Sequence, residues 1–425
     1  MKYFGTDGIR GEINKDLNYN LIKKVAKAVV IYYKKHKLNK TLLVGNDSRI
    51  SSDYILGVLS SVLLCHGIEI HNVGVCSSPC LAYLTKKYNY PLSLMISASH
   101  NPSNYNGIKF FNNRGEKVDD CFEQEFETYM SQNLPTQNDF TIIKNVEKIK
   151  QDYVAYLKQI KHFDIDCIID CANGGTSEIC KQIFNKFEKI NIRPNGNNIN
   201  ENAGCTHIEK LKSLCIKKQK IGFAFDGDGD RIHVVTTNGY VITGDKILYI
   251  LSKFFQKSGD SLIGTIYTNT GLENCLKQRN ILLKRAPVGD KNVYKLMTEN
   301  NSTLGGEDSG HIILKPYSNT GDGVLIAIVL SNILQLSKLS IDELLENYTE
   351  YYQYKQNINL YDKFSATDNL KQTIKSYEKQ GSKVIIRPSG TEPVLRIFVE
   401  NKNETLAKTT LSRLVEIIKK VKDTP

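Results

Sequence analysis

The stretch SLMISASHNP at residues 93–102 carries an apolar run directly into Ser-His-Asn-Pro and raises the question of what the serine does there. Its apolar first half is typical of a buried strand, so Ser99 and His100 fall at the carboxyl end of that strand. Open α/β sheets bind their ligands at this end. A serine hydrolase would need a Gly-x-Ser-x-Gly elbow, which is absent, and adjacent residues on one backbone rarely form a nucleophile–base pair. Ser99 therefore needs another partner, and SASHNP taken alone is equally compatible with a capped turn.

Strands and amphipathic helices alternate on both sides of this stretch. TLLVG at 41–45 and IEIHNVG at 68–74 predict strands, and the run between them predicts a helix capped by a serine. The alternation starts again near residue 150, with a strand IGFAF at 221–225, and a third time near residue 245. The fold class that we expect is α/β, with three similar domains built on mixed, largely parallel sheets.

The last part of the chain has a different pattern. KVIIR at 383–387 and VLRIFVE at 394–400 predict two strands joined by a loop, and two helices accompany them. The tyrosine-rich segment ENYTEYYQYKQ before them is interpreted as a bridge, so a small C-terminal α+β domain is expected. The expected domains span residues 1–147, 148–244, 245–345 and 346–425.

Composition indicates a soluble, folded protein of several domains. The chain has 425 residues, of which 40% are hydrophobic and 24% charged. The net charge of +11 comes from lysines scattered over helical faces, which favours solvated surfaces, and no basic strip with exposed aromatics indicates nucleic-acid binding. A positive balance does suit an anionic small substrate.

The cysteines and the N-terminus indicate a reducing, cytoplasmic location. The ten cysteines lack the paired spacing of a zinc site and are interpreted as buried thiols. No signal core and no apolar run long enough to span a bilayer is present, so no membrane partner is expected.

The motif DGDGDR carries the most constrained chemistry. Asp226, Asp228 and Asp230 alternate with glycine, so a tight loop can turn three carboxylates toward one point, where a hard cation such as Mg²⁺ would neutralise them. An EF-hand is excluded, because its sixth position is Arg231 instead of glycine and its twelfth is Thr237 instead of glutamate. A structural turn without an ion is the alternative.

A cation held by these carboxylates gives Ser99 a role. Octahedral Mg²⁺ keeps open positions, and a phosphate oxygen is their usual occupant. If Ser99 carries a phosphoryl group, the cation can bind it and neutralise charge during transfer. The serine is then a phosphate carrier that needs no acid–base triad.

Two further loops offer groups for an anion and a sugar. RPSGTEP combines an arginine fork, hydroxyls and a flexible backbone, which together suit an anion nest: Arg387, Ser389, Gly390 and Thr391. GGEDSGH offers Glu307, Ser309 and His311, a set suited to sugar hydroxyls and proton transfer. Acidic glycine-rich loops are common, so GGEDSGH alone decides nothing.

Taken together, the four loops resemble the α-D-phosphohexomutase family. SASHNP, DGDGDR, GEDSGH and RPSGTEP resemble its nucleophile, metal, sugar and phosphate loops in the family's order. GTDGIRG at 5–11, NGIKFF at 106–111, VGDKNV at 288–293 and TGDG at 320–323 also match, so the resemblance covers every expected domain. It implies four domains around one central cleft and a reaction in which a phosphoserine enzyme converts a hexose monophosphate through a bisphosphate intermediate.

The resemblance also implies site roles. It implies a phosphorylated Ser99 that joins Asp226, Asp228 and Asp230 in binding one Mg²⁺ per chain, with a hexose bisphosphate as activator and intermediate. Arg10, His100, Lys109 and Arg231 match positions near the transferring group, and Lys109 matches the proton-transfer partner. The remaining positions match substrate contacts: Lys291, Glu307, Ser309 and His311 for the sugar, and Arg387, Ser389, Gly390 and Thr391 for the non-reacting phosphate.

Within the family, FGTDGIRG and PNGNNINENAGCTH at 194–207 resemble the bacterial branch that interconverts glucosamine 6-phosphate and glucosamine 1-phosphate for amino-sugar nucleotide and cell-wall precursor synthesis. Cys205 and Asp308 depart from that branch's usual residues and leave the choice of sugar open. The alternatives are a phosphomannomutase or phosphoglucomutase, and an inactive paralogue that binds phosphosugars. A monomer or a homodimer is expected.

Overall fold

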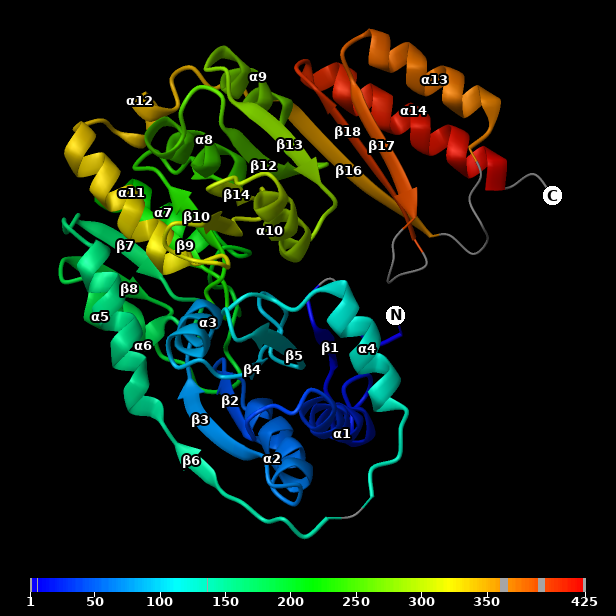
Figure 1. Cartoon of the computed structure of the whole chain (residues 1–425). Coiled ribbons are helices and arrows are strands. Elements are labelled where there is room, and N and C mark those ends of the chain that lie inside the picture. Colours follow the sequence, from blue (N-terminus) through cyan, green and yellow to red (C-terminus); the bar gives the residue numbers. More distant parts are fainter. Residues whose placement is uncertain (1, 6, 136, 360–365, 389–393, 423–425) are drawn as a thin grey trace. The chain divides into compact units, whose positions relative to one another are not determined.

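The computed structural model describes residues 2–5, 7–135, 137–359, 366–388 and 394–422. The chain divides into two compact units (Figure 1). The first comprises residues 1–267 and 279–346, and the second comprises residues 268–278 and 347–425. The first unit contains three sheets and the second contains one.

The first sheet has the strand order β1-β5-β4-β2-β3-β6. Its elements are β1 (Ile9–Glu12), α1 (Tyr19–Lys35), β2 (Thr41–Asn46), α2 (Ser51–Leu63), β3 (Glu69–Val75), α3 (Ser78–Lys87), β4 (Leu92–Ile96), β5 (Tyr105–Asn112), α4 (Asp120–Met130) and β6 (Ile143–Asn145). Apolar residues of α1, α2 and α4 form one core with alternate residues of the strands, among them Ile108 and Phe110. Lys109, between these two, points to the opposite face, which α3 contacts.

The second and third sheets follow in the same unit. The second has the order β11-β10-β9-β7-β8 and the third β13-β12-β14-β15. The elements of the second are η1 (Glu147–Ile149), α5 (Lys150–Ile160), β7 (Cys167–Asp170), α6 (Ser177–Ile183), β8 (Phe187–Ile190), α7 (Glu209–Lys218), β9 (Ile221–Phe225), β10 (Ile232–Val235) and β11 (Val241–Ile242). Those of the third are α8 (Gly244–Phe255), β12 (Ser261–Thr265), β13 (Leu282–Ala286), α10 (Asp290–Glu299), β14 (Leu304–Gly306), β15 (Ile312–Leu314), α11 (Gly323–Ser337) and α12 (Ile341–Leu344).

All three sheets share one four-stranded topology. The orders β5-β4-β2-β3, β10-β9-β7-β8 and β15-β14-β12-β13 are equivalent: three parallel strands, then a fourth antiparallel to the third. The expected α/β class and the repeated architecture are therefore confirmed. In each sheet the connection from the third to the fourth strand carries one of the quoted motifs: SASHNP, DGDGDR and GEDSGH.

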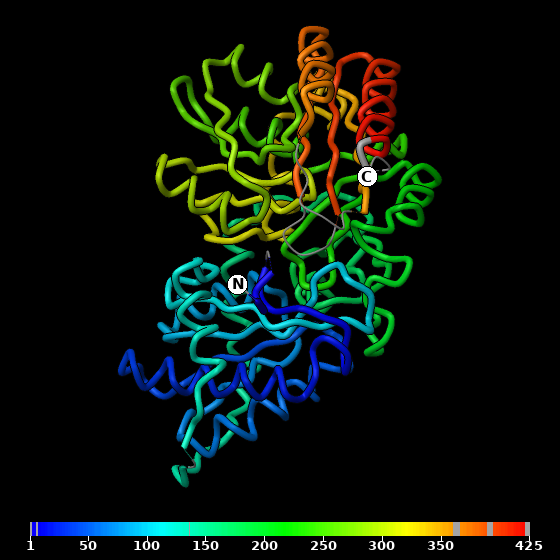
Figure 2. Tube along the Cα trace, turned by 90° about the vertical axis from the view of Figure 1, so that its right-hand side faces the viewer, coloured from blue at the N-terminus to red at the C-terminus, as the bar shows by residue number. Residues whose placement is uncertain are grey.

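The second unit contains a three-stranded antiparallel sheet, β16-β18-β17. Its elements are α9 (Thr270–Gln278), β16 (Tyr352–Asn359), α13 (Asp368–Lys379), β17 (Lys383–Pro388), β18 (Val394–Asn401) and α14 (Glu404–Lys422). The helices α13 and α14 pack on one face of this sheet (Figure 2). The α+β prediction is confirmed, but the expected count of two strands is wrong. The tyrosine-rich segment continues into β16, whose only buried residue is Ile358, so backbone pairing with β18 rather than an apolar alternation defines it.

Two smaller expectations have different outcomes. The helix α2 begins after Ile50 without a side-chain cap, so the predicted serine cap is wrong. The domain boundaries stay a prediction, although each of the four sheets lies within one expected domain.

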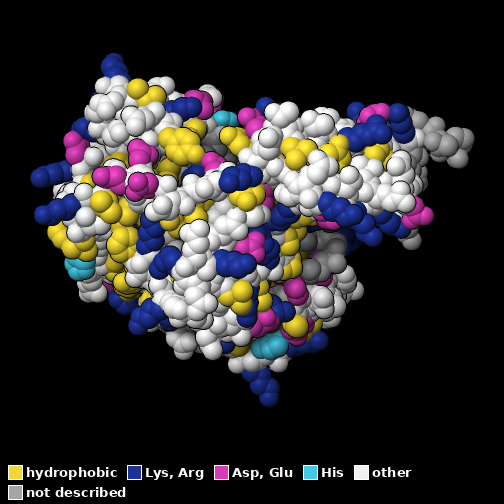
Figure 3. Space-filling view, turned by 90° about the horizontal axis from the view of Figure 1, so that it is seen from above, with side chains coloured by type: hydrophobic (Ala, Val, Ile, Leu, Met, Phe, Trp, Pro, Cys, Tyr) yellow, Lys and Arg dark blue, Asp and Glu magenta, His cyan; other side chains and the backbone are white. Residues whose placement is uncertain are grey.

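The face of the molecule shown in Figure 3 carries mixed charges. On the face shown in Figure 3, Lys and Arg side chains are spread between acidic and apolar ones, as solvated surfaces require. No helix among the described residues combines the length and the apolarity that a membrane span needs.

Asp322 links two helices of the first unit and generates a pH-dependent prediction. Its carboxylate accepts hydrogen bonds from the Leu325 backbone at the start of α11 and from the Tyr153 hydroxyl of α5, the latter at 2.7 Å. Burial raises the pKa of Asp322 from 3.8 to about 6. The folded protein thus holds this proton more tightly than the unfolded chain, which stabilises the fold at low pH and is lost as the pH rises through 6.

We expect wild type to lose about 1.4 kcal/mol of unfolding free energy between pH 5 and pH 8 relative to Asp322→Asn, because only the carboxyl group ionises. Urea unfolding of both proteins at the two pH values measures this difference. A difference that stays constant with pH would contradict the assignment.

Candidate active site

Ser99 lies in the connection between β4 and β5 in an uncommon backbone conformation. Its φ is +53°, in the left-handed region, and the residue is buried. The Ser99 hydroxyl donates a hydrogen bond to the carboxylate of Asp226. The strand end and the metal loop, which are separated by more than 100 residues in sequence, therefore meet at this serine.

The three alternating aspartates form one buried cluster. One carboxylate oxygen each of Asp226, Asp228 and Asp230 lies within 4.8 Å of the others. The Oδ1 atoms of Asp228 and Asp230 are buried and have no hydrogen-bond partner among the described residues. Buried carboxylate oxygens without a partner are costly, and an all-oxygen set suits a hard divalent cation. The residues present therefore fit Mg²⁺.

Glycines allow the metal loop to approach its neighbours closely. A Cβ atom at Gly227 would lie 2.6 Å from the Ser99 carbonyl oxygen. Gly229 has a φ of +72°, and a Cβ there would lie 2.2 Å from the Thr176 side chain. Any larger residue at Gly227 would push the metal loop away from the serine loop.

Lys109 is a fully enclosed counter-charge for the cluster. It comes from the face of β5 that is opposite the main apolar core, and its Nζ lies 2.6 Å from Asp228, 3.4 Å from Asp230 and 2.9 Å from Asp7. Burial would lower the pKa of Lys109, but these three carboxylates raise it well above its ordinary value. Lys109 therefore stays protonated at neutral pH.

A second set of charges extends the cluster. Lys117 pairs with Asp290, lies 2.9 Å from Asp7 and lies 3.6 Å from Asp230. His311 Nε2 lies 3.0 Å from Asp290, which together with Asp230 raises the pKa of His311 against the effect of burial. The cluster thus joins the three motif-bearing connections with the N-terminal segment and α10.

Sequence reasoning missed three members of this cluster. Asp7 and Asp290 lie in GTDGIRG and VGDKNV, two segments that were quoted for the resemblance, so a signal for them existed. Lys117 follows the turn after β5 and belongs to no motif, so only the fold identifies it.

Burial and neighbouring charges shift the pKa values of Asp226, Asp230 and His100 in different directions. Burial raises the pKa of Asp226 to about 8, and Asp230 and Asp228 add to this rise. Burial also acts on Asp230, but Lys109 and Lys117 hold the pKa of Asp230 well below its ordinary value. Burial, with the nearby charges of Arg231 and Arg10, lowers the pKa of His100 to about 4. His100 is therefore neutral at physiological pH.

The predicted arginines lie at the rim of the cluster. Arg10 Nε donates to the backbone oxygen of Asp7 at 3.0 Å, and its guanidinium pairs with the Asp7 carboxylate. The Arg231 backbone donates to Asp226 at 3.2 Å, and its Nε lies 3.9 Å from Asp230.

The sugar loop joins the metal loop through the backbone. The amide of Ile232 donates to the Gly310 carbonyl at 3.1 Å, and Arg231 pairs with His311 in a single bridge. Glu307 Oε1 accepts from the Gly289 amide at 2.9 Å, and the Ser309 hydroxyl is buried without a hydrogen-bond partner among the described residues.

Asp308 faces α8 instead of the charge cluster. Its carbonyl accepts from the Gly244 amide at 3.0 Å, and its Oδ1 lies 3.5 Å from the Asp245 amide. A carboxylate at a helix N-terminus is favourable, because the first amides of the helix lack intrahelical acceptors.

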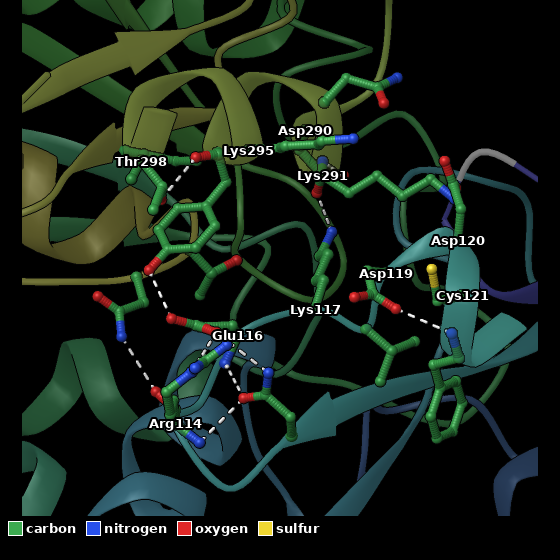
Figure 4. A pocket seen from close by; sticks show the side chains of 18 of the residues that line it. Arg114, Glu116, Lys117, Asp119, Asp120, Cys121, Asp290, Lys291, Lys295 and Thr298 are labelled. Carbon is green, nitrogen blue, oxygen red and sulfur yellow. Dashed lines mark hydrogen bonds and ion pairs between the residues drawn. The ribbon is translucent and has the colours of Figure 1, made fainter. Parts of the chain in front are cut away.

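A cavity of about 560 Å³ adjoins the cluster (Figure 4). The segment after β5, the start of α4, and α10 line it, and Lys117, Asp290 and His311 belong to its wall. Lys291, expected at the substrate, reaches across to α4, where its Nζ lies 2.8 Å from Asp120 and 2.6 Å from Glu123.

The phosphate-clamp residues divide between described and undescribed parts of the chain. Arg387 is half-buried near the end of β17. Ser389, Gly390 and Thr391 lie outside the described residues.

Comparison with known proteins agrees with this geometry. Models of the phosphoglucomutase/phosphomannomutase family match residues 1–137 (α/β/α domain I), 243–352 (α/β/α domain III) and 353–417 (C-terminal domain). The phosphoglucosamine mutase of Halalkalibacterium halodurans is 39% identical over 98% of this chain and 98% of that protein. The phosphoglucosamine mutase of Bacillus subtilis is 36% identical over the same shares.

Solved structures show the same fold. A phosphoglucomutase/phosphomannomutase family protein from Burkholderia thailandensis has a TM-score of 0.81 at 20% identity and covers 99% of this chain and 98% of its own. An Aspergillus fumigatus N-acetylphosphoglucosamine mutase, solved with GlcNAc-6P and magnesium, has a TM-score of 0.67 at 15% identity, with 98% and 95% covered. The family resemblance is thus confirmed: the chain belongs to the α-D-phosphohexomutase family, with phosphoglucosamine mutases as relatives along almost its whole length.

Proposed function

We propose that the protein is a phosphoglucosamine mutase that interconverts glucosamine 6-phosphate and glucosamine 1-phosphate. The observation that carries this proposal is the hydrogen bond from Ser99 to Asp226, which joins a carrier serine to a carboxylate cluster that fits Mg²⁺. The relatives of that name, at 36–39% identity over 98% of the chain, support the choice of sugar. Its product would enter amino-sugar nucleotide and cell-wall precursor synthesis.

The reaction would move one phosphoryl group in each direction. The bond between phosphorus and Ser99 Oγ breaks, a bond from a sugar hydroxyl oxygen to phosphorus forms, and the hydroxyl proton passes to the serine side. The resulting hexose bisphosphate then reverses its orientation at the site and returns its other phosphoryl group to Ser99. Atoms and charge balance over the cycle, and the enzyme ends phosphorylated as it began.

Asp226, Asp228 and Asp230 would hold Mg²⁺ together with a phosphoryl oxygen on Ser99. Bound there, Mg²⁺ would neutralise charge on the transferring group. The near-fixed backbone of the loop keeps the three carboxylates in place: the Ser78 amide donates to the Asp228 carbonyl at 2.8 Å and the Gly323 amide donates to the Gly229 carbonyl at 3.0 Å.

Lys109 and His100 would meet the transferring group in different charge states. Lys109 is held protonated by its carboxylate neighbours, so it would stabilise the transferring phosphoryl group electrostatically, and the family resemblance implies that it is also the proton-transfer partner. His100 is neutral at physiological pH, so its ring would take part in hydrogen bonds without a charge. Arg10 and Arg231 would contact the phosphoryl oxygens as bidentate donors.

Substrate contacts would come from the remaining motif residues. Glu307, Ser309 and His311 would face the sugar, with Lys291 beside them after release from its partners on α4. Arg387, Ser389, Gly390 and Thr391 would hold the non-reacting phosphate. A cytoplasmic location belongs to the same proposal and is supported by the buried cysteines of the described chain, among them Cys76, Cys80 and Cys171, which form no disulfide. A monomer or homodimer remains our expectation.

Ser99 is expected to carry phosphate, because its hydroxyl faces the carboxylate cluster. Ser99→Ala should lower kcat by at least about a thousandfold while the fold is kept. Intact-protein and peptide mass spectrometry after incubation with a hexose bisphosphate locates the phosphate. Ser103→Ala, on the same loop, is the matched control and should keep activity. Phosphate on Ser97, or full activity of Ser99→Ala, would contradict the assignment of Ser99 as the phosphorylated residue.

Loss of one carboxylate should weaken Mg²⁺ binding. Asp228→Asn removes a charge and a ligand oxygen, so its Mg²⁺ affinity should fall by roughly 100-fold, and transfer should slow with it. Calorimetric titration with Mg²⁺ measures the affinity independently of activity. Asp166→Asn, a surface carboxylate paired with Lys220, is the control. Undiminished activity of wild type in excess chelator would contradict the metal site.

Glucosamine 6-phosphate should be the preferred substrate, by about tenfold in kcat/KM over glucose 6-phosphate and mannose 6-phosphate. Asp308→Gln should keep this preference, because the Asp308 carboxylate lies at the start of α8. Steady-state assays of the phosphorylated enzyme with the three hexose 6-phosphates decide the matter. A higher kcat/KM for mannose or glucose 6-phosphate would favour a phosphomannomutase or phosphoglucomutase, and no turnover of any would favour a phosphosugar-binding paralogue.

A further inference from the structure

Arg49 is a buried arginine whose guanidinium binds the serine loop, the connection from β4 to β5 that contains Ser99. The side chain is fully enclosed, and its Nη1 and Nη2 atoms donate to backbone oxygens of that loop. Nη2 donates to Ser99 at 3.0 Å and to Asn101 at 2.7 Å, while Nη1 donates to Tyr105 at 2.9 Å and also to Pro102. One planar group thus fixes four carbonyl positions of the connection between β4 and β5.

Asn200 supplies a second hold on the same carbonyls. It comes from the segment PNGNNINENAGCTH after β8, a motif that the proposed chemistry leaves unused. Its Nδ2 donates to Ser99 at 2.8 Å and to Asn101 at 3.0 Å. No backbone amide among the described residues donates to either carbonyl, so these two side chains provide their hydrogen bonds.

The network also reaches the amide side of Ser99. Asp47 accepts from Arg49 Nε at 3.0 Å and from the Ser97 hydroxyl at 2.6 Å. The Ser97 hydroxyl accepts in turn from the Ser99 amide at 2.9 Å. Both the amide and the carbonyl of Ser99 are therefore held, on either side of its Cα.

This matters because the Ser99 backbone adopts a conformation that residues with a side chain avoid. A φ of +53° at a non-glycine residue persists where its surroundings enforce it, and such residues cluster at functional sites. The same conformation aims the hydroxyl at Asp226.

We propose that Arg49 and Asn200 are positioning residues that hold Ser99 in its left-handed conformation, so that its oxygen is presented to the carboxylate cluster for phosphoryl transfer. The proposal rests on the proposed function. Neither residue contacts the cluster through its own side chain in this network; each acts through the backbone of the serine loop.

The first test separates positioning from folding. Arg49→Met should lower kcat by about 100-fold, the cost of a small misplacement of a reacting group, with KM for the sugar phosphate within about twofold of wild type. Arg49→Lys keeps the charge but loses the planar fork. It should therefore restore at most about a tenth of the kcat that Arg49→Met loses. Asn200→Ala should lower kcat by about tenfold.

Arg279→Met is the matched control. Arg279 also donates to backbone oxygens, those of Ser252 at 3.1 Å and Gln256 at 3.2 Å, but these lie on and next to α8. Arg279→Met should lower the melting temperature about as much as Arg49→Met does, while its kcat stays within about twofold of wild type.

The second test reads the Ser99 conformation without catalysis. Glycine adopts a positive φ without steric cost, so Ser99→Gly should melt at a higher temperature than Ser99→Ala. If Arg49 enforces the conformation, this order should vanish or reverse when both changes are made in the Arg49→Met background. If Arg49→Met does not fold, Asn200→Ala provides the background instead.

The outcomes are distinguishable. Inactive wild type would overturn the proposed function. The melting temperatures of Ser99→Gly and Ser99→Ala would still test the positioning role, because they do not depend on activity. Active wild type with equal kcat losses in Arg49→Met and Arg279→Met would overturn the inference. An unchanged order of Ser99→Gly and Ser99→Ala in the Arg49→Met background would overturn it as well.

Discussion

Three aspartates buried in one loop are the constraint on which the rest of this structure depends. Charges removed from water must be compensated, and the Oδ1 atoms of Asp228 and Asp230 have no hydrogen-bond partner in the part of the chain that the structure describes. Lys109 and Lys117 supply part of the compensation, and Asp7 and Asp290 hold these lysines in place. The unpartnered carboxylate oxygens suit a hard divalent cation.

The repeated sheet topology brings these charges together. Each of the three sheets in the first unit places a motif in the connection from its third to its fourth strand. That connection leaves the carboxyl end of a parallel strand, which is where α/β sheets present ligand-binding groups. One architecture used three times therefore delivers a serine loop, a metal loop and a sugar loop, and the backbone bonds between the latter two join them.

The serine loop and the metal loop approach each other closely, which restricts their backbone conformations. Residues in and next to these loops make the close approach possible. Gly227 lets the metal loop lie against the Ser99 carbonyl, while Arg49 and Asn200 hold that carbonyl from two separate sheets. The serine is left in a backbone conformation that only its surroundings maintain. Side-chain hydrogen bonds from Arg49 and Asn200 thus hold the backbone of the serine loop.

The sequence by itself determined those features in which neighbouring residues carry the whole signal. The alternating aspartates of DGDGDR, the serine after an apolar run and the alternation of strand and helix are local patterns, so they predicted the carboxylate cluster, the position of Ser99 at a strand end and the α/β class. The strand β16 escaped this reasoning because its side chains are mostly exposed and show no apolar period. The orientation of Asp308 likewise depends on the fold, which turns its carboxylate toward α8.

Only the tertiary structure decided which distant residues complete the site. Asp7, Lys117 and Asp290 come from three separate segments, and Arg49 and Asn200 from two more, yet each finds its partner through hydrogen bonds or ion pairs across the folded chain. A single arginine or lysine in a sequence is most often solvated, so nothing in its neighbours distinguishes one that is enclosed. Burial creates that difference, because a charge removed from water must find an opposite charge or a carbonyl within hydrogen-bond distance, and only the fold defines which ones are there.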